Sequence, residues 1–410
     1  MNGRLIGEMI RVALGAIWAN KLRSFLTILG NVVAVGSIVT LVSLIQGLTE
    51  EVTNVILTEV GADAFLVERV GLVLGEDDEE LARSNPRITL DDFEALRQSD
   101  GRFSAVIAQG DRRGEIRYGE HVLESVKIRG VTEDFARFPE FEAETGRLPT
   151  RSEVRRRRNV ALLGWSAADR LFEGADPLDG TITVQGVHFR VVGVSEKKGS
   201  MFGQSLDEFV VIPLGAYQRL FGSRARLSLM VRPSDPDEIE RAMDEAIVAL
   251  RIERRLRARE DNNFGMFTSD TALDLYNQAT SGIFAVLVGV VSLALVVAGI
   301  VIMNIMLMAV SERTREIGLR KALGARRRDV MWQVLSESVA LSLLGGVFGT
   351  ALGATAATII DRFAPVPASV HVWSIVLAIS LTAVVGLFFG IYPAAKAASL
   401  DPIDALGRVS

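Results

Sequence analysis

Charged side chains that could bind a protein partner are concentrated in one short segment, residues 311–328. Glu312 and Glu316 are four residues apart, as are Arg313 and Ile317, so a helix here would carry one polar face and another able to enter a groove. The candidate contact residues are Glu312, Arg313, Arg315, Glu316, Arg320 and Lys321. The plainer alternative is that the arginines only orient the chain and attract anionic lipid, at roughly 1 kcal/mol each near a membrane surface.

Residue types that perform catalysis or bind metal form no recognisable site in this sequence. There are no cysteines, and the three histidines, His121, His188 and His371, are too scattered to form a spaced ligand pair. Residues 203–207 resemble a nucleophile elbow, but the stretch ends in Asp207 where that motif needs glycine, and no suitable histidine is near it. We expect no catalytic residue, no directly bound cofactor and no metal site.

The elements that must position the charged segment are set by hydropathy. The chain has 410 residues, of which 49% are apolar and 23% charged, with a mean hydropathy of +0.29. Four runs lack Asp, Glu, Lys and Arg altogether: 24–49, 275–311, 338–360 and 363–395. Each is long enough to cross a bilayer, which takes roughly 20 apolar residues in a helix. This pattern excludes a purely cytosolic enzyme.

Charge asymmetry sets the orientation of these helices. Residues 1–23 carry four basic and one acidic side chain, and residues 312–331 carry seven basic and three acidic, whereas residues 48–280 have a net charge of −11. Because basic loops stay in the cytoplasm, both termini and the charged segment are predicted inside, and residues 48–280 outside. The first uncharged run exceeds the roughly 7 to 15 residues of a signal core, so we expect an uncleaved anchor in the inner or plasma membrane.

The predicted fold is an α-helical membrane protein with four transmembrane helices, one before and three after a large extracytoplasmic α+β domain. The expected segments, in order, are a cytoplasmic amphipathic helix (1–23), helix one (24–47), an outer domain of two lobes (48–280), helix two (281–310), a cytoplasmic loop (311–331), helix three (332–360), a short outer loop (361–371), helix four (372–395) and a cytoplasmic tail (396–410).

Small residues mark where the membrane helices should pack closely. Glycines recur at four-residue spacing in helix three and again in helix four, a pattern that lets helix backbones approach each other in lipid. They are Gly345, Gly349 and Gly353, then Gly386 and Gly390. The spacing alone leaves open whether these surfaces contact the same chain or a second permease copy. Glu337, at the cytoplasmic end of helix three, is expected to reach the interface or to pair with a basic residue of the 311–331 loop.

The outer segment predicts short strands and amphipathic helices. Residues 89–98 read as a helix capped by Thr89 with Asp92 at the third helical position, and residues 182–194 as a hairpin turning at Gln185-Gly186. Residues 236–259 read as a longer helix, acidic early and basic late. The basic run 155–158 and the acidic run 76–80 are expected to be solvent-facing.

Three stretches carry a family resemblance. The segment after helix two reads SERTREIGLRKALGARRRDVMWQVLSESVALSLLGGVFGTALG, and the last stretch reads GIYPAAKAASLDPIDAL. The outer segment contains GRLPTRSEV, then NVALLGWSAADRLFEGADPLDGTITVQGVHFRVVGV and GSMFGQSLDEFVVIPL. Together they resemble the permease family that includes MacB-type macrolide exporters, lipoprotein-releasing permeases and cell-division FtsX proteins, with the outer segment nearest to the MacB type.

The resemblance implies a subunit of an ABC transporter that works by mechanotransmission, in which cytoplasmic ATPase subunits bind the charged segment and move the membrane helices and the outer domain. The 410 residues contain no Gly-Lys dipeptide and hence no Walker A loop, so ATP and Mg²⁺ are expected in a separate ATPase. Four crossings imply a second copy or a sister permease. The other expected partners are the lipid membrane and a periplasmic adaptor, and no nucleic acid is expected.

Three functions remain open on this resemblance. The first is export or extrusion driven by the ATPase partner, which the MacB-like outer segment favours. The second is FtsX-like regulation of an envelope hydrolase or a signalling partner. The third is release of lipoproteins from the membrane.

Overall fold

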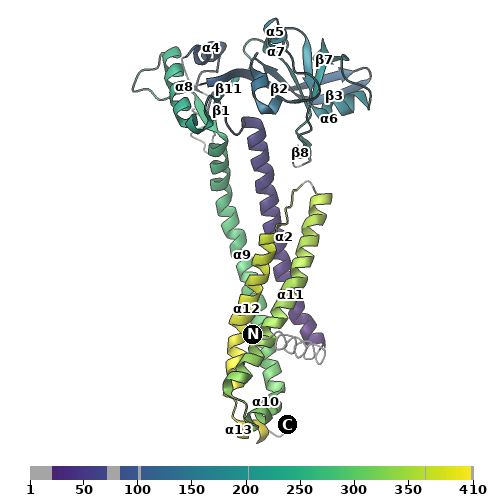
Figure 1. Cartoon of the computed structure of the whole chain (residues 1–410), viewed down its shortest axis with the longest axis vertical. Helices are drawn as coiled ribbons and strands as arrows, with labels where there is room; N and C mark the ends of the chain where they lie inside the picture. Colours follow the sequence, from purple (N-terminus) through teal and green to yellow (C-terminus); the bar gives the residue numbers. More distant parts are fainter. Residues whose placement is uncertain (1–20, 72–83, 100–102, 202, 365, 408–410) are drawn as a thin grey trace. The chain divides into compact units, whose positions relative to one another are not determined.

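The computed structural model describes residues 21–71, 84–99, 103–201, 203–364 and 366–407 (Figure 1). Nearly all of the expected amphipathic helix 1–23 and the acidic run 76–80 lie outside these residues. The chain divides into two compact units. The membrane unit comprises residues up to 51 together with those from 279 onwards, and the outer unit comprises residues 52–278. Each unit is described by itself below.

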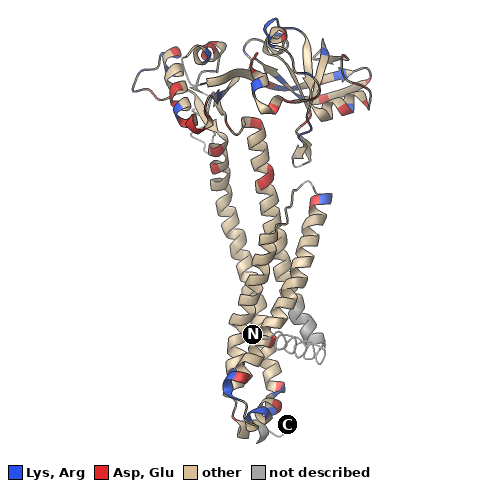
Figure 2. Ribbon diagram, in the orientation of Figure 1, with Lys and Arg blue, Asp and Glu red and all other residues tan. Residues whose placement is uncertain are grey.

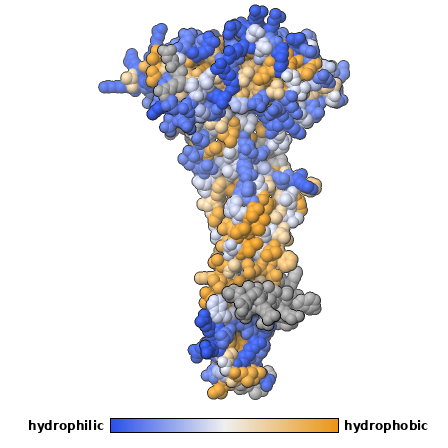
Figure 3. All heavy atoms as spheres, viewed as in Figure 1, coloured by the Kyte–Doolittle hydropathy of each residue, from blue (hydrophilic) through white to orange (hydrophobic). Residues whose placement is uncertain are grey.

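Long apolar helices make up the membrane unit, and four of those described are long and apolar enough to cross a membrane. They are α2 (Lys21–Val60), α9 (Ser269–Glu312), α11 (Arg327–Phe363) and α12 (Val372–Ser399). Two short helices, α10 (Thr314–Ala322) and α13 (Pro402–Gly407), complete the unit. Charged residues gather around α10 and at the far end of α11, with uncharged helix between them (Figure 2). On the face shown in Figure 3, apolar side chains cover the middle of the long helices.

The long helices extend beyond the segments expected from hydropathy. Helix α2 continues to Val60 and α9 begins at Ser269, so both ends of the expected outer segment 48–280 are helical. Helix α9 leaves several apolar side chains more than half exposed, among them Val286, Val290 and Leu293. Exposed valine and leucine on the uncharged stretch 275–311 of this helix are suited to lipid contact.

The glycines of the third and fourth membrane helices contact neighbouring helices of the same chain. A Cβ added at Gly353 would lie 2.6 Å from the carbonyl oxygen of Gly36, and one at Gly349 would lie 2.8 Å from that of Val32, both in α2. The Asn31 side-chain amide of α2 donates to the Ser342 carbonyl at 2.7 Å. The Asn31 side chain also fills the space that a Cβ at Gly345 would occupy. On α12, Gly386 and Gly390 receive the side chains of Ser342 and Ser338 of α11. Of the two alternatives, these surfaces therefore pack within the chain.

The short connection between α11 and α12 packs against α2. The Ser369 amide donates to the Ser43 carbonyl at 3.0 Å, and His371 Nε2 lies 3.1 Å from a carboxylate oxygen of Glu50. A Cβ at Gly47 would lie 2.5 Å from the Pro367 carbonyl oxygen, so only glycine admits this approach. The connection is thereby held to the same helix that α11 contacts through its glycines.

The outer unit is built on one mixed sheet, which among the described residues has ten strands in the order β12-β1-β11-β2-β3-β10-β5-β7-β4, with β6 paired to β2 and β7. Pairs β3–β10 and β5–β7 are parallel and the other pairs are antiparallel. This sheet runs through the compact unit 52–278, and the division of the outer segment into two lobes stays a prediction. The strands are β1 (Phe65–Glu68), β2 (Phe103–Tyr118), β3 (His121–Val131), β4 (Ala143–Gly146), β5 (Val160–Leu163), β6 (Thr181–Val184), β7 (Val187–Ser195), β10 (Phe209–Pro213), β11 (Ser228–Pro233) and β12 (Gly265–Thr268), with a separate pair β8 (Ser200–Met201) and β9 (Gln204–Ser205).

Alternating side chains of the strands feed two hydrophobic cores, one on each face of the sheet. In β2, Val106 and Ala108 join the core that also contains Leu171 and Tyr217, whereas Ile107 joins the opposite core with several phenylalanines. This two-residue period is the one expected of a strand buried on both faces. The helices of the unit are α4 (Leu90–Gln98), α5 (Arg151–Arg155), α6 (Trp165–Phe172), α7 (Leu214–Phe221) and α8 (Ile239–Glu253), with short 3₁₀ turns at Phe135–Arg137, Pro139–Phe141 and Pro236–Glu238.

Two local predictions are confirmed and one is wrong at its end. Thr89 and Asp92 form a reciprocal capping box on α4, and Gln185 and Gly186 turn the β6–β7 hairpin with φ of 48° and 81°. The helix expected over 236–259 begins as a 3₁₀ turn and α8 ends at Glu253. Arg254, at the end of α8, forms a buried ion pair with Asp92 at 2.8 Å, and Arg255 after it has a φ of 54°, a left-handed conformation that ends the helix.

Candidate functional site

Helix α10 carries most of the charged segment singled out from the sequence. Helix α9 ends just before Arg313, and α10 begins just after it. Gly324, with a φ of 102°, lies in the turn that leads towards α11. Ile317 is buried in the core of the membrane unit with Met306 of α9 and Val334 of α11. Helix α10 is therefore packed into the unit along one side.

Polar contacts fix the inner side of α10 to α11. Arg313 Nη1 lies 3.4 Å from Glu337 Oε2, which confirms that Glu337 pairs with a basic residue of this segment. Arg320 lies 2.6 Å from the Glu316 carboxylate and donates to the Gln333 side-chain oxygen at 2.8 Å. These five residues line a cavity of about 190 Å³ between α9, α10 and α11.

Lys321 and Gly318 connect α10 to the last part of the described chain. The Lys321 ammonium donates to the Ala398 carbonyl at 3.0 Å and also to that of Leu400, so a cation satisfies carbonyl groups left open at the end of α12. A Cβ at Gly318 would lie 2.5 Å from the Ala405 side chain, so α10 and α13 are in close contact. A displacement of α10 would therefore act on α11, α12 and α13 together.

The outer side of α10 has a different character. Arg315 is exposed and forms no ion pair with any described residue, and Glu312, the last residue of α9, is also exposed. Leu319 is 52% exposed and Leu323 is 82% exposed. Since Arg315, Leu319 and Leu323 follow at four-residue spacing, they share one face. We call these three residues the outer face of α10.

Sequence reasoning missed the apolar part of this face. It selected the charged residues, of which Arg313, Glu316, Arg320 and Lys321 make contacts within the chain. The signal for the leucines was present in their four-residue spacing from Arg315, in a segment otherwise rich in charge. A cationic residue beside two exposed leucines is a combination that can insert into a groove of a partner protein.

Comparison with known proteins identifies the family to which this arrangement belongs. Residues 24–248 match the family model for the MacB-like periplasmic core domain, and residues 288–402 match that for the FtsX-like permease C-terminal region. The macrolide export ATP-binding/permease protein MacB of Bdellovibrio bacteriovorus is 32% identical over 95% of this chain and 60% of its own length. The uncharacterized ABC transporter permease YknZ of Bacillus subtilis is 30% identical over 97% of this chain and 98% of its own length. The chain belongs to the MacB-type family of ABC transporter permeases.

The two family matches divide this MacB-type permease in a way that follows its structure. The FtsX-like match takes in α10, α11 and α12, and the MacB-like match includes most of the sheet. The chain spans about 60% of the length of several MacB relatives, including that of Chlorobaculum tepidum, which is 33% identical. Multi-pass placement in the cell membrane follows from the family and from the four apolar helices.

A second charged cluster of this permease joins the end of α2 to the sheet of the outer unit. The Glu59 carboxylate lies 2.8 Å from Arg129 and 3.0 Å from Lys127, both in β3, and Arg129 lies 2.9 Å from Asp111 in β2. Although burial lowers the pKa of Arg129, its two carboxylate partners outweigh that effect and raise the pKa above its ordinary value. Arg129 therefore stays charged and holds α2 to two strands.

Next to this cluster lies a carboxyl group that has no hydrogen-bond partner. Glu140 is 7% exposed, and neither of its carboxylate oxygens is hydrogen-bonded in the described structure. Burial raises the pKa of Glu140 to about 7, against the opposing attraction of Arg129 and Lys198. Glu140 is thus a group that changes charge near neutral pH inside the outer unit.

Proposed function

We propose that this chain is the permease subunit of an ABC exporter whose separate cytoplasmic ATPase subunits bind the outer face of α10. The observation that carries the proposal is the two-sided character of α10. Its inner side is fixed by the Arg313–Glu337 pair and by Lys321, whereas Arg315, Leu319 and Leu323 are exposed on the other side. A helix that is fixed to its own chain on one side and exposes apolar surface on the other can bind a partner protein and transmit that partner's movement.

The contacts of α10 would transmit a movement of the ATPase to the membrane helices. Ile317 packs with residues of α9 and α11, and Lys321 holds the end of α12, so movement of α10 would displace these helices together. Tight packing transmits such a displacement because a well-packed core is hardly compressible. Helices α2 and α9 each continue into the outer unit, which gives the motion a covalent path to the extracytoplasmic side. We infer that ATP and Mg²⁺ act in the partner subunits.

The assembly that we propose has two permease subunits, either two copies of this chain or this chain with a sister permease, and two ATPase subunits. Both chain ends and α10 face the cytoplasm in this proposal, as the basic character of residues 312–331 favours. A periplasmic adaptor is a further possible partner of the outer unit in the assembly.

The test is association with an ATPase followed by a measurement of coupling. The full chain is purified in nanodiscs together with a candidate ABC ATPase subunit from the same organism, and ATP turnover is measured with and without the permease. We expect a stable complex and a permease-dependent change in turnover. Absence of both would contradict the proposal.

A deletion strain separates export from the other two uses of the same coupling. If the deletion strain becomes sensitive to a toxic compound, or releases less of a compound into the medium, export is supported. A change in cell-wall hydrolase activity with export intact would indicate FtsX-like regulation, and retention of lipoproteins in the inner membrane would indicate lipoprotein release.

A further inference from the structure

The outer unit presents a run of four consecutive arginines, residues 155–158, at the end of α5. All four are exposed, as expected from the sequence. Three of them form no ion pair or side-chain hydrogen bond with any described residue, and we call these three the arginine turn: Arg156, Arg157 and Arg158. We propose that the arginine turn binds an acidic segment of a partner protein. The inference does not depend on how the permease is driven.

Four neighbouring arginines each have a carboxylate partner. The pairs are Arg147 with Glu153 at 2.8 Å, Arg151 with Asp134 at 2.6 Å, Arg155 with Glu133 at 2.8 Å and Arg190 with Asp179 at 3.7 Å. Because these carboxylates are already paired, the arginine turn is a local excess of positive charge in a segment, 48–280, whose net charge is −11. A basic patch on an otherwise acidic surface attracts an acidic partner to one place and orients it.

Glu153, the carboxylate closest in sequence to the arginine turn, is already bonded to other groups. It lines the same cavity of about 560 Å³ as Arg156 and Arg158. Its carboxylate oxygens accept hydrogen bonds from the Arg147 guanidinium and from the backbone amide and hydroxyl of Thr150, all at 2.8 Å. The hydrogen bonds from Arg147 hold the pKa of Glu153 down, to about 2. Glu153 therefore stays ionised and bonded to these two residues, and the arginine turn keeps its excess charge.

The backbone of the arginine turn is held in one conformation. Arg156 is the C-cap of α5, and Arg157, with a φ of 53°, takes the left-handed conformation that glycine usually supplies after a helix. Arg219 donates to the Arg157 carbonyl at 3.1 Å. A Cβ at Gly215 would lie 2.5 Å from Arg157 Cγ, so the stem of Arg157 packs against α7. An arginine in a conformation that favours glycine, on a turn fixed by its neighbours, indicates a use for its side chain.

Two features favour an acidic protein segment over anionic lipid or a compact polyphosphate. No large apolar side chain is exposed among residues 147–160, whereas surfaces that bind a membrane usually insert apolar groups. The cavity beside the turn contains the ionised Glu153, which would repel a compact anion inside it. An extended acidic segment can pair with the exposed guanidinium groups outside the cavity, and arginine clusters recognise acidic motifs in this way.

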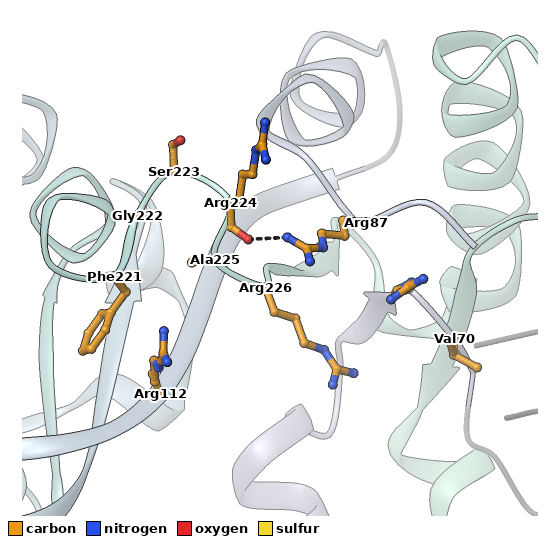
Figure 4. A pocket seen from close by; sticks show the side chains of 10 residues that line it. Val70, Arg87, Arg112, Phe221, Gly222, Ser223, Arg224, Ala225 and Arg226 are labelled. Carbon is orange, nitrogen blue, oxygen red and sulfur yellow. Dashed lines mark hydrogen bonds between the residues drawn. The ribbon is translucent and has the colours of Figure 1, made fainter. Parts of the chain in front are cut away.

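A second arginine pair of the outer unit provides a matched control (Figure 4). Arg112 of β2 and Arg224, in the loop before β11, are exposed and form no ion pair with a described residue. They line a separate cavity of about 770 Å³. Neutralising this pair removes as much charge from the outer unit as neutralising Arg156 and Arg158, at a different place.

The experiment measures binding of a fluorescein-labelled octaglutamate peptide to the full chain by fluorescence anisotropy, in a maltoside detergent at low salt. We expect one saturable site per chain. The double variant Arg156→Gln/Arg158→Gln should weaken binding about tenfold. This loss corresponds to about 1.4 kcal/mol and is the size expected for two exposed ion pairs. Arg156→Lys/Arg158→Lys, which keeps the charge but loses the planar fork, should give a smaller loss.

Two control variants should bind the peptide as the wild type does: Arg112→Gln/Arg224→Gln, and Arg327→Gln/Arg328→Gln at the start of α11. Hydrogen exchange in β5 and β7 should show that all variants are folded. Equal weakening in either control variant, or binding that does not saturate, would mean nonspecific attraction and would overturn the site.

Three further results would contradict the proposal. The first is absence of peptide binding to the wild type. The second is stronger competition by tripolyphosphate, or by phosphatidylglycerol in mixed micelles, than by unlabelled peptide, which would assign the turn to phosphate groups. The third is binding that appears only after the acidic side chains of residues 76–80 are replaced by their amides, which would assign the turn to the acidic run of this chain.

Discussion

At the scale of single residues, the outer unit contains two kinds of buried ionisable group: an ion pair, and a carboxyl group without a hydrogen-bond partner among the described residues. Arg254 and Asp92, with side-chain exposures of 8% and 3%, compensate each other at 2.8 Å. Glu140 has no such partner for its carboxylate oxygens. Buried charge is tolerated only when it is paired or neutralised. Arg254 and Asp92 pair with each other, whereas burial raises the pKa of Glu140 to about 7, so that it holds a proton below that pH.

The raised pKa of Glu140 makes the outer unit less stable as the pH rises. Between pH 4.5 and about 7 the folded unit holds a proton that the unfolded chain releases, so the free energy of unfolding falls through this window, by at most about 3 kcal/mol. Hydrogen exchange at residues 138–142, corrected for intrinsic rates, should show less protection at pH 8 than at pH 5. Glu140→Gln should remove the difference, and Glu142→Gln, at an exposed neighbour, should keep it. A difference that persists in Glu140→Gln would assign it to another group.

Arg315 is the residue at which partner binding can be separated from folding. Reversing Arg320 would also break its contacts with Glu316 and Gln333, whereas Arg315 forms no ion pair with any residue that the structure describes. Arg315→Glu should therefore reduce association with the ATPase at least about tenfold, with expression and thermal unfolding unchanged. Arg362→Glu, an exposed arginine at the opposite end of α11, is the charge-matched control. Equal binding by Arg315→Glu and wild type in a pull-down would exclude this face as the contact.

At the scale of elements, glycines set how closely α11 approaches α2. Gly353→Ala should force the helices apart, because its Cβ would meet the Gly36 carbonyl, and overpacking of this kind costs about 1–3 kcal/mol. The thermal midpoint of the full chain in detergent should fall. Gly282→Ala in α9, where a Cβ would meet nothing within 4 Å, is the same substitution without the contact, and it should leave the midpoint unchanged or slightly higher. Equal effects of the two variants would argue against close packing at Gly353.

The same elements show which features sequence could predict. The capping box of α4 and the Gln185-Gly186 turn involve residues close together in the chain, so the local sequence was sufficient to predict both. The buried ion pair at the end of α8 joins Arg254 to Asp92, 162 residues away, and no local pattern indicates that contact. Glycine spacing predicted close packing but could not tell which helix would be contacted. The charge of α10 was visible, but its division into an anchored and an exposed side required the positions of α11 and α12.

At the scale of the whole molecule, the absence of cysteine from the sequence makes its topology directly measurable. The proposed mechanism requires α10 and the outer unit to lie on opposite sides of the membrane. Arg315→Cys and Ser223→Cys each introduce one exposed thiol, the first on α10 and the second on the outer unit. In intact cells or spheroplasts, a membrane-impermeant maleimide should label Ser223→Cys and leave Arg315→Cys unlabelled until the membrane is permeabilised. Equal labelling of both variants before permeabilisation would show that both residues lie outside. A cytoplasmic ATPase could not then bind α10.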